Sequence, residues 1–278
     1  FFSDCLFFPL FYVVKYRRKV VKKQLDECFP EKSMKEKRDI ERQFYHFFCD
    51  YLMEVIKLFS ISKKEMMRRM EFVGLDEVRA DLERENKKFC FLYLGHYCNW
   101  EYIASLAYWL PEIHCGQIYH RIYNQSFDDL FLKLRGQFGG ESILMKETLR
   151  RILTLRGQEK KVMIGFISDQ LPKWENMNHW TTFLNHETSF FIGAERIAKQ
   201  VDAALYYVRV ERIRRGYYRA SFECMALHPK EYPDYELTDL YSRRLEEQIR
   251  QQPGYWLWTH KRWKRTKEDW LKWKEDNK

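Results

Sequence analysis

The chain has 278 residues, enough for one large α/β domain or two small ones and for a sizeable buried core. Lysine and arginine outnumber aspartate and glutamate by 49 to 40, so we expect partners that carry negative charge: anionic lipid, phosphorylated substrate, acidic protein or nucleic acid. The seven cysteines form no Cys-x-x-Cys pair, which argues against a disulfide framework and against a structural zinc site.

The N-terminal segment is apolar and leads directly into a basic cluster. Residues 1–14 are interrupted by Asp4 and Pro9 and are shorter than the ~20 residues that cross a bilayer. Residues 15–23 hold six lysines and arginines, as is typical of a helix that leaves a membrane on its cytoplasmic side. Because the chain begins at Phe1 rather than at a methionine, we expect a fragment or a processed chain. Three interpretations of residues 1–14 follow: the end of a longer anchor, an interfacial helix or a core segment.

Apolar periodicity and chain-breaking residues predict alternating helices and strands along the rest of the chain. A helix capped by Ser33 is expected at 33–60, and further helices are expected at 63–70, 99–110, 147–156, 194–199 and 237–251. The helix at 237–251 is expected to be the last one. Residues 130–134 form an amphipathic run. Strands are expected at 89–94, 115–119 and 161–169, with a hairpin at 205–213 and 217–227 and a long surface loop at 171–188. The absence of repeats and of an internal linker favours one domain.

A strand, a tight turn and a helix follow each other in the stretch that contains the two strongest catalytic candidates. The apolar run Phe89–Leu94 predicts a buried strand, Gly95 breaks it, and Asn99 is a good cap for the helix that follows. His96 and Glu101 therefore lie at the turn beyond the carboxyl end of a strand. Open α/β sheets gather their ligands at this edge.

The spacing of His96 and Glu101 limits how they meet. Five steps along one helix would separate them by roughly 140°, so His96 must precede the helix and Glu101 must lie in its first turn. A carboxylate bonded to one ring nitrogen would fix the tautomer and leave the other nitrogen to take a proton. This is the imidazole–carboxylate half of a catalytic triad, without a nearby serine. Alternatively Glu101 is a capping carboxylate near a hydrogen-bonded histidine, and this stretch taken alone favours that simpler interpretation.

Other residues of the sequence are also candidates for a functional site. His96, Arg121 and Asp169 each follow a predicted strand, as the polar groups of a shared cleft would. Cys98 lies too close to His96 for good nucleophile geometry and reads as a small core residue. No HExxH, Walker A or GxGxxG sequence supports a metal or nucleotide cofactor.

The C-terminal stretch WLWTHKRWKR (256–265) interleaves tryptophans with basic residues, which fits a bilayer interface or nucleic acid. The lack of a recognisable nucleic-acid-binding motif favours the membrane.

Five stretches together resemble a known family. They are YRRKVVKKQLDECFP (16–30), GHYCNWE (95–101), IYHRIYNQSFDDLFLKLRGQFGG (118–140) with Asn124, Asp128 and Arg135, SDQ (168–170) and WTHKRWK (258–264). In this order, over nearly the whole chain, they are similar to the bacterial lipid A late acyltransferases of the lysophospholipid acyltransferase superfamily. Two departures are present. His120, followed by Arg121, stands where the family often has arginine or lysine, and residues 171–188 lack a family-typical glycine pair.

The resemblance implies an α/β fold of the glycerolphosphate acyltransferase type, with a single mixed central sheet flanked by helices and an N-terminal membrane-associated helix. We accordingly expect a membrane-proximal segment, residues 1–30, and an acyltransferase domain, residues 31–278. The implied location is the cytoplasmic face of the inner membrane. The implied partners are an acyl carrier protein, a lipid acceptor and an anionic membrane surface, without nucleic acid, metal or cofactor.

The implied reaction moves a fatty acyl chain from an acyl carrier protein thioester to a hydroxyl of a lipid A precursor. His96 would take the hydroxyl proton, and Glu101 would hold the imidazole and stabilise its charged form. The implied substrate-binding residues are Arg121, Asn124, Arg135 and Asp169. A lysophospholipid or lyso-amino-acid-lipid acceptor remains open. So does a catalytically inactive membrane-surface or nucleic-acid-binding protein whose binding would depend on Arg262 and Lys264.

Overall fold

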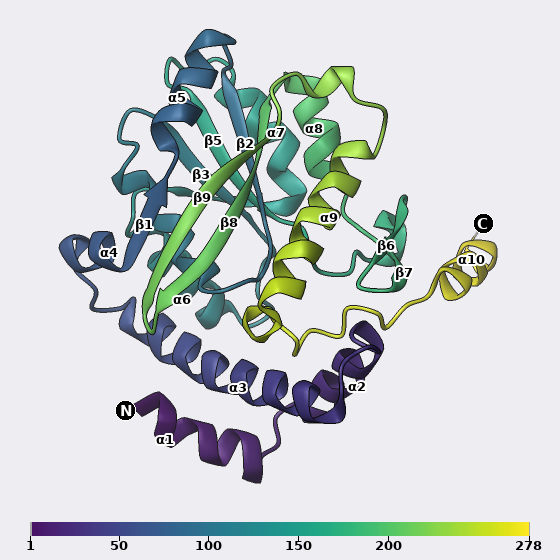
Figure 1. Cartoon of the computed structure of the whole chain (residues 1–278). Coiled ribbons are helices and arrows are strands. Elements are labelled where there is room, and N and C mark those ends of the chain that lie inside the picture. The colour runs from purple at the N-terminus through teal and green to yellow at the C-terminus, as the bar shows by residue number, and fades with distance from the viewer. Residues whose placement is uncertain (1, 278) are drawn as a thin grey trace.

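A seven-stranded mixed sheet runs through the centre of the protein in the computed structural model, which describes residues 2–277 (Figure 1). In sheet order its strands are β1 (Met70–Val73), β9 (Tyr217–Ala226), β8 (Ala204–Arg214), β2 (Phe89–Leu94), β5 (Val162–Ile167), β3 (His114–Tyr119) and β4 (Glu141–Leu144). The neighbouring strands from β8 to β4 are parallel, β9 returns antiparallel to β8, and β1 is parallel to β9. The α/β class and the single mixed central sheet are therefore confirmed.

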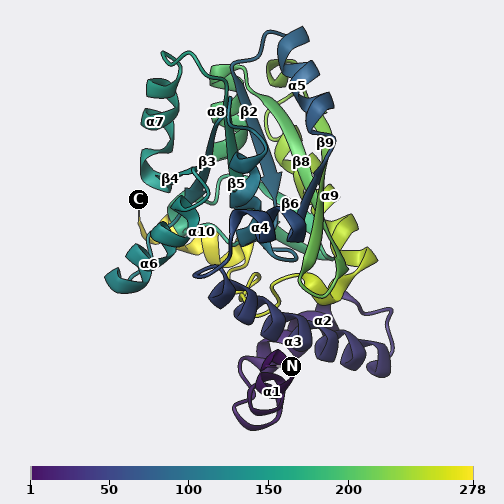
Figure 2. The same ribbon diagram turned by 90° about the vertical axis from the view of Figure 1, so that its left-hand side faces the viewer.

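Helices cover both faces of this sheet (Figures 1 and 2). The α-helices are α1 (Phe2–Phe8), α2 (Arg18–Cys28), α3 (Met34–Lys57), α4 (Lys63–Arg69), α5 (Leu75–Arg84), α6 (Gln125–Gly136), α7 (Thr148–Leu155), α8 (Gly193–Val201), α9 (Glu236–Gln251) and α10 (Lys267–Asp276). Shorter turns are the π-helical η1 (Pro9–Val13) and the 3-10 helices η2 (Trp100–Tyr108), η3 (Met145–Glu147), η4 (Trp174–Asn176), η5 (Pro229–Glu231) and η6 (Pro253–Tyr255).

Alternate side chains of β2 face different layers, because successive residues of a strand point to opposite faces. Tyr93 stacks on Tyr241 of α9, with ring centroids 4.7 Å apart, so α9 lies over this face. Leu92 pairs with Tyr206 of β8, and the Tyr206 hydroxyl donates to Asp81 of α5 at 2.6 Å on the other face. The 3-10 helix η2 lies on the same face as α5. The sheet is thus buried on both sides, which explains the continuous apolar sequence of β2.

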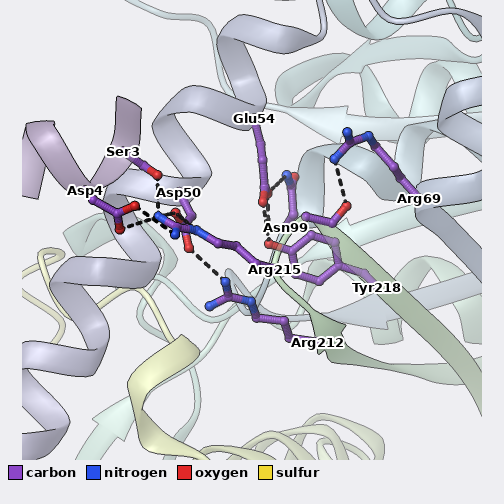
Figure 3. Close-up of polar contacts among 10 residues, drawn as sticks. Ser3, Asp4, Asp50, Glu54, Arg69, Asn99, Arg212, Arg215 and Tyr218 are labelled. Atoms are coloured by element: carbon purple, nitrogen blue, oxygen red, sulfur yellow. Dashed lines mark hydrogen bonds and ion pairs between the residues drawn. The ribbon is translucent and has the colours of Figure 1, made fainter. Parts of the chain in front are cut away.

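The N-terminal elements lie outside α3, at the edge of the molecule where the β8–β9 hairpin turns (Figures 1 and 2). Phe7 of α1 stacks on His46 of α3, with centroids 3.7 Å apart, and Phe7 and Phe11 are buried in the main core. Asp4 pairs with Arg215 at the hairpin turn at 2.6 Å (Figure 3). Among residues 2–277, no helix combines the length and apolar character that crossing a bilayer requires.

Most of the predicted elements are present, and two expectations were wrong. Residues 171–188 are not a plain loop, because they contain β6 (Trp180–Phe183) and most of β7 (His186–Ser189), which form an antiparallel hairpin. Its turn residues, Leu184 and Asn185, both have positive φ, which suits a two-residue hairpin turn. The second error concerned the C-terminus, where α10 follows the helix expected to be the last. Strands β1 and β4 and helix α5 were not predicted.

The basic C-terminal stretch is divided between the interior and the surface: Arg262 is buried, whereas Lys261 and Lys264 are exposed. Arg262 is fully buried, and its guanidinium donates to the Thr188 hydroxyl at 2.6 Å and to the Ser189 carbonyl at 2.7 Å, both on β7. Burial lowers the pKa of Arg262 to about 10. The expectation that Arg262 would carry surface binding is therefore wrong, since its charge holds the β6–β7 hairpin against the core.

Candidate active site

Two adjacent parallel strands bring the central pair of the site together. Leu94 of β2 pairs with Ile167 of β5, and both strands end there. His96 and Asp169 each lie two residues beyond this pair, so they reach the same point of the carboxyl edge. Gly95 lets α9 pack close to this turn, because a Cβ atom there would lie 2.6 Å from Leu245 Cδ1 and the leucine side chain would have to shift. The placement of His96 beyond a strand follows the sequence prediction.

Asp169 holds the His96 imidazole. His96 Nδ1 lies 2.6 Å from Asp169 Oδ1, and the His96 backbone N–H donates to Oδ2 at 3.0 Å. Trp256 Nε1 donates to the same oxygen at 2.8 Å. Burial opposes ionisation of Asp169, but the facing His96 and these hydrogen bonds lower its pKa to about 2. An ionised Asp169 accepts the Nδ1 proton and leaves His96 Nε2 as the free basic atom.

Glu101 has a different partner, which corrects the prediction that it holds the imidazole. Arg135 of α6 binds it in a bidentate pair, Nε to Oε2 at 2.8 Å and Nη2 to Oε1 at 2.6 Å. Glu101 is buried and Arg135 is about one-fifth exposed, so the pair is largely removed from water. The carboxylate thus fixes a permanently charged guanidinium in the wall of the cavity that His96 also lines. Sequence distance suggested the wrong carboxylate, because Asp169 is 73 residues from His96 but one strand away in the sheet.

A large cavity opens beside this cluster. It has a volume of about 1090 Å³ and is lined by His96, Glu101 and Arg135 at its polar end. Its apolar wall includes Leu92, Ile103, Leu106, Cys115, Met163 and Ile167. Because Met163 and Ile167 lie four residues apart on one face of β5, the wall extends about 13 Å along the sheet from the site.

Gly165 lies in the middle of this wall and widens the cavity. It shares its face of β5 with Met163 and Ile167 and is partly accessible although β5 is an interior strand. A Cβ atom at this position would make only ordinary contacts, 3.8 Å to the Gly116 carbonyl oxygen and 3.9 Å to Leu94 Cδ2. A longer side chain would enter the cavity.

The remaining predicted binding residues lie at the rim or outside it. Arg121 lines the rim and contacts Gln125 and, at 3.7 Å, Asp128, and its side chain is largely exposed. His120, the residue that departs from the family pattern, also lines the cavity, so His120 and Arg121 face the same opening. Asn124 is not in the cavity wall. Its side chain caps α6 by accepting from the Phe127 N–H at 3.2 Å.

Three residues of the site were not singled out from the sequence. Trp256 donates to Asp169, and Gln170 Nε2 lies 3.3 Å from His96 Nε2. The Trp100 ring packs edge-on against the imidazole, with centroids 5.0 Å apart. Gln170 and Trp100 lie within stretches that carried the family resemblance, and Trp256 lies in the aromatic and basic stretch 256–265. Cys98, in contrast, is fully buried, and burial raises the pKa of its thiol well above the usual range, which argues against a nucleophile.

Within residues 2–277, histidine, cysteine, aspartate and glutamate form no group of three or more that is arranged to hold a metal ion. The side chains at the cavity supply an imidazole oriented by Asp169, a guanidinium fixed by Glu101 and an apolar wall.

An imidazole–carboxylate pair at the open end of a long apolar cavity defines a class of enzyme, one that activates a hydroxyl or water beside a hydrocarbon chain. The comparison with known families gives the more specific identity. The chain belongs to the bacterial lipid A biosynthesis acyltransferase family, whose profile matches residues 6–265. It is accordingly an acyltransferase, and the family implies a lipid acceptor. A search of curated proteins found no match to this chain.

Proposed function

We propose that the protein transfers a fatty acyl chain from an acyl carrier protein thioester to a hydroxyl group of a lipid A precursor. The observation that carries this proposal is the His96–Asp169 pair, 2.6 Å apart, at the polar end of a cavity of about 1090 Å³ in a member of this family. The cavity is large enough for a hydrocarbon chain, and His96, which supplies the base, lines the same cavity.

The proton movements follow from the hydrogen bonds. His96 Nε2 takes the proton of the acceptor hydroxyl as its oxygen attacks the thioester carbonyl carbon, while ionised Asp169 stabilises the imidazolium. The new C–O bond forms, the tetrahedral intermediate collapses, and the C–S bond breaks. His96 then returns the proton to the departing thiolate sulfur. No acyl-enzyme is needed, because the acceptor hydroxyl is the nucleophile.

Arg135 is proposed to stabilise the negative charge that develops on the carbonyl oxygen. It lines the same cavity as His96, and its guanidinium is fixed by both oxygens of Glu101. A donor that is held in place before the reaction needs no reorganisation when the charge appears. Glu101 is thus proposed to act by positioning Arg135, and not by holding the imidazole as the sequence suggested.

The rim is proposed to bind the phosphorylated parts of both substrates. Four cations line it, Arg121, Lys146, Lys173 and Arg196. Arginine and lysine suit the phosphates of a lipid A precursor and of phosphopantetheine, and the excess of basic residues suits an acidic carrier protein.

Membrane attachment is proposed to use the membrane-proximal segment, residues 1–30. Its outer side exposes Phe8 by 62%, Val13 by 67% and Val14 by 66%. These apolar side chains are followed directly by the basic residues 15–23, an arrangement that favours the anionic cytoplasmic face of an inner membrane. Residues 31–278 would then form the catalytic domain on that surface.

The test is acyl transfer by detergent-solubilised protein with labelled acyl carrier protein thioester. A lipid A precursor, a lysophospholipid and a lyso-amino-acid lipid are offered in parallel. We expect transfer to the lipid A precursor and a loss of ~10²–10⁴-fold or more in His96→Ala, because the general base is removed. Transfer to another acceptor would correct the substrate. Full activity of His96→Ala, with its fold intact, would exclude the mechanism.

A further inference from the structure

The position of η2 sets the geometry of the site. Its first residue, Trp100, packs on His96, and its second, Glu101, holds Arg135. Further along η2, Ile103, Ala104 and Leu106 form part of the cavity wall. A 3-10 helix of nine residues is unusually long, and its hydrogen bonds are weaker than those of an α-helix. An external support for its first turn therefore matters.

That support is a buried carboxylate on α3. Asn99 caps η2 by accepting from the Tyr102 N–H at 3.3 Å, and its own amide donates to Glu54 Oε2 at 2.7 Å (Figure 3). The Tyr218 hydroxyl donates to the same oxygen at 2.8 Å, on the opposite side of Glu54. Asn99, Glu54 and Tyr218 are all buried. The link from α3 to η2 thus runs through the Asn99 side chain, which is hydrogen-bonded on one side to Glu54 and on the other to the Tyr102 N–H, inside the core.

We propose that Glu54 is a positioning residue for acyl transfer, which orients Trp100 and Glu101 by holding the Asn99 cap of η2. This inference rests on the proposed function. Glu54 touches neither the cavity nor the His96–Asp169 pair, so its effect on the reaction passes through Asn99. Tyr51, one turn earlier on α3, supports the same region, because its ring lies 4.4 Å from that of Trp100.

The chemistry of Glu54 agrees with an orienting role. Burial raises the pKa of Glu54, which reflects the cost of removing the carboxyl group from water. An apolar side chain would be buried here at lower cost. Directed hydrogen bonds distinguish a carboxyl group from an apolar residue of similar size. Here those bonds specify the direction of the Asn99 amide and, with it, the start of η2.

The same helix offers a matched control. Asp50 lies one turn before Glu54 on α3 and is equally buried. It pairs with Arg212 at 2.8 Å and with Arg215 at 2.7 Å, both near the β8–β9 turn, and Arg215 continues to Asp4 of α1 (Figure 3). Removing Asp50 also removes a buried acid from α3, but its partners do not cap η2.

The experiment compares Glu54→Leu, Glu54→Gln and Asp50→Leu in the full chain, by kcat and KM for the acyl donor and by hydrogen exchange of the η2 amides. We expect Glu54→Leu to lower kcat about 10–100-fold with little change in KM, because a misplaced site loses rate rather than binding. Glu54→Gln should recover most of the rate, since its amide oxygen still accepts from Asn99. Asp50→Leu should keep near-native kcat, and the Tyr102 amide should exchange faster only in Glu54→Leu.

Two outcomes would overturn the inference: native kcat in folded Glu54→Leu, or an equal loss of kcat in Asp50→Leu. If Glu54→Leu does not fold, Asn99→Ala breaks the same link from the other side, and native kcat there would be equally decisive. Failure of the proposed function gives a different result. Wild-type protein would then transfer no acyl group, while the exchange of the Tyr102 amide would still support or refute the role of Glu54.

Discussion

The two ends of the cavity differ in chemistry although the same strands build them. At the carboxyl ends of β2 and β5, Asp169 holds the His96 imidazole, and a second carboxylate, Glu101 of η2, holds the Arg135 guanidinium of α6. Further along the strands the wall is apolar, with Met163 as an example. From this difference we expect reaction rate and acyl-chain selection to be separable. Polar groups would govern the chemistry, and side-chain volume along the strands would govern which chains fit.

The two carboxylates at the polar end also differ from each other. Asp169 faces an imidazole, which can pass a proton to or from a substrate, whereas Glu101 faces a guanidinium that stays charged. One pair can therefore take part in proton transfer, and the other supplies a fixed positive charge. Substitutions at four residues, Asp169, Glu101, Arg135 and Gly165, sharpen this comparison and the contrast between the two ends.

The largest effect is expected from Asp169→Asn. An asparagine amide facing His96 Nδ1 would favour the tautomer with its proton on Nε2, so the base would be lost with little change in shape. We expect kcat to fall ~10²–10⁴-fold, with KM for the acyl donor nearly unchanged. Single-turnover acyl transfer measures this directly, with circular dichroism as the control for folding. A decrease below about tenfold would show that Asp169 does not fix the base.

A smaller effect is expected from Glu101→Gln. Arg135 would lose one of its two charge-assisted hydrogen bonds and would no longer be held in a single orientation. We expect kcat to fall about 10–100-fold.

Arg135→Lys should give a similar loss, and the double variant should lose little more than either single variant, because the two residues act as a unit. Additive losses in that double-mutant cycle would mean that Glu101 and Arg135 act independently.

The smallest effect on rate and the clearest effect on selectivity are expected at the apolar end, from Gly165→Leu. The new side chain would enter the cavity about 7 Å along β5 from Ile167, so long acyl chains would no longer fit. We expect the ratio of long-chain to short-chain transfer to fall about tenfold while short-chain turnover is largely kept.

Gly157→Leu, at an exposed position after α7, is the matched control. An unchanged preference in folded Gly165→Leu would show that the acyl chain does not lie along this wall.

The local sequence pattern predicted much of the fold and the placement of His96 and Asp169 beyond strand ends, but not which side chains pair in the site. Strand β2, the break at Gly95 and the Asn99 cap follow from apolar runs, chain breakers and capping chemistry, all of which act within a few residues. Strand β5 and the position of Asp169 beyond it were predicted in the same way. Short, half-exposed strands such as β6 escaped prediction because four residues carry little periodicity.

The sequence by itself determined which segments form strands and helices, that His96 and Asp169 lie beyond strand ends, and the family to which the chain is similar. Only the tertiary structure decided which carboxylate holds the imidazole, that Glu101 binds Arg135, and that Trp256 closes the far side of Asp169. The physical reason is the range of the interactions. Element formation depends on neighbours along the chain, whereas these pairings depend on which strands lie side by side once the whole core is buried.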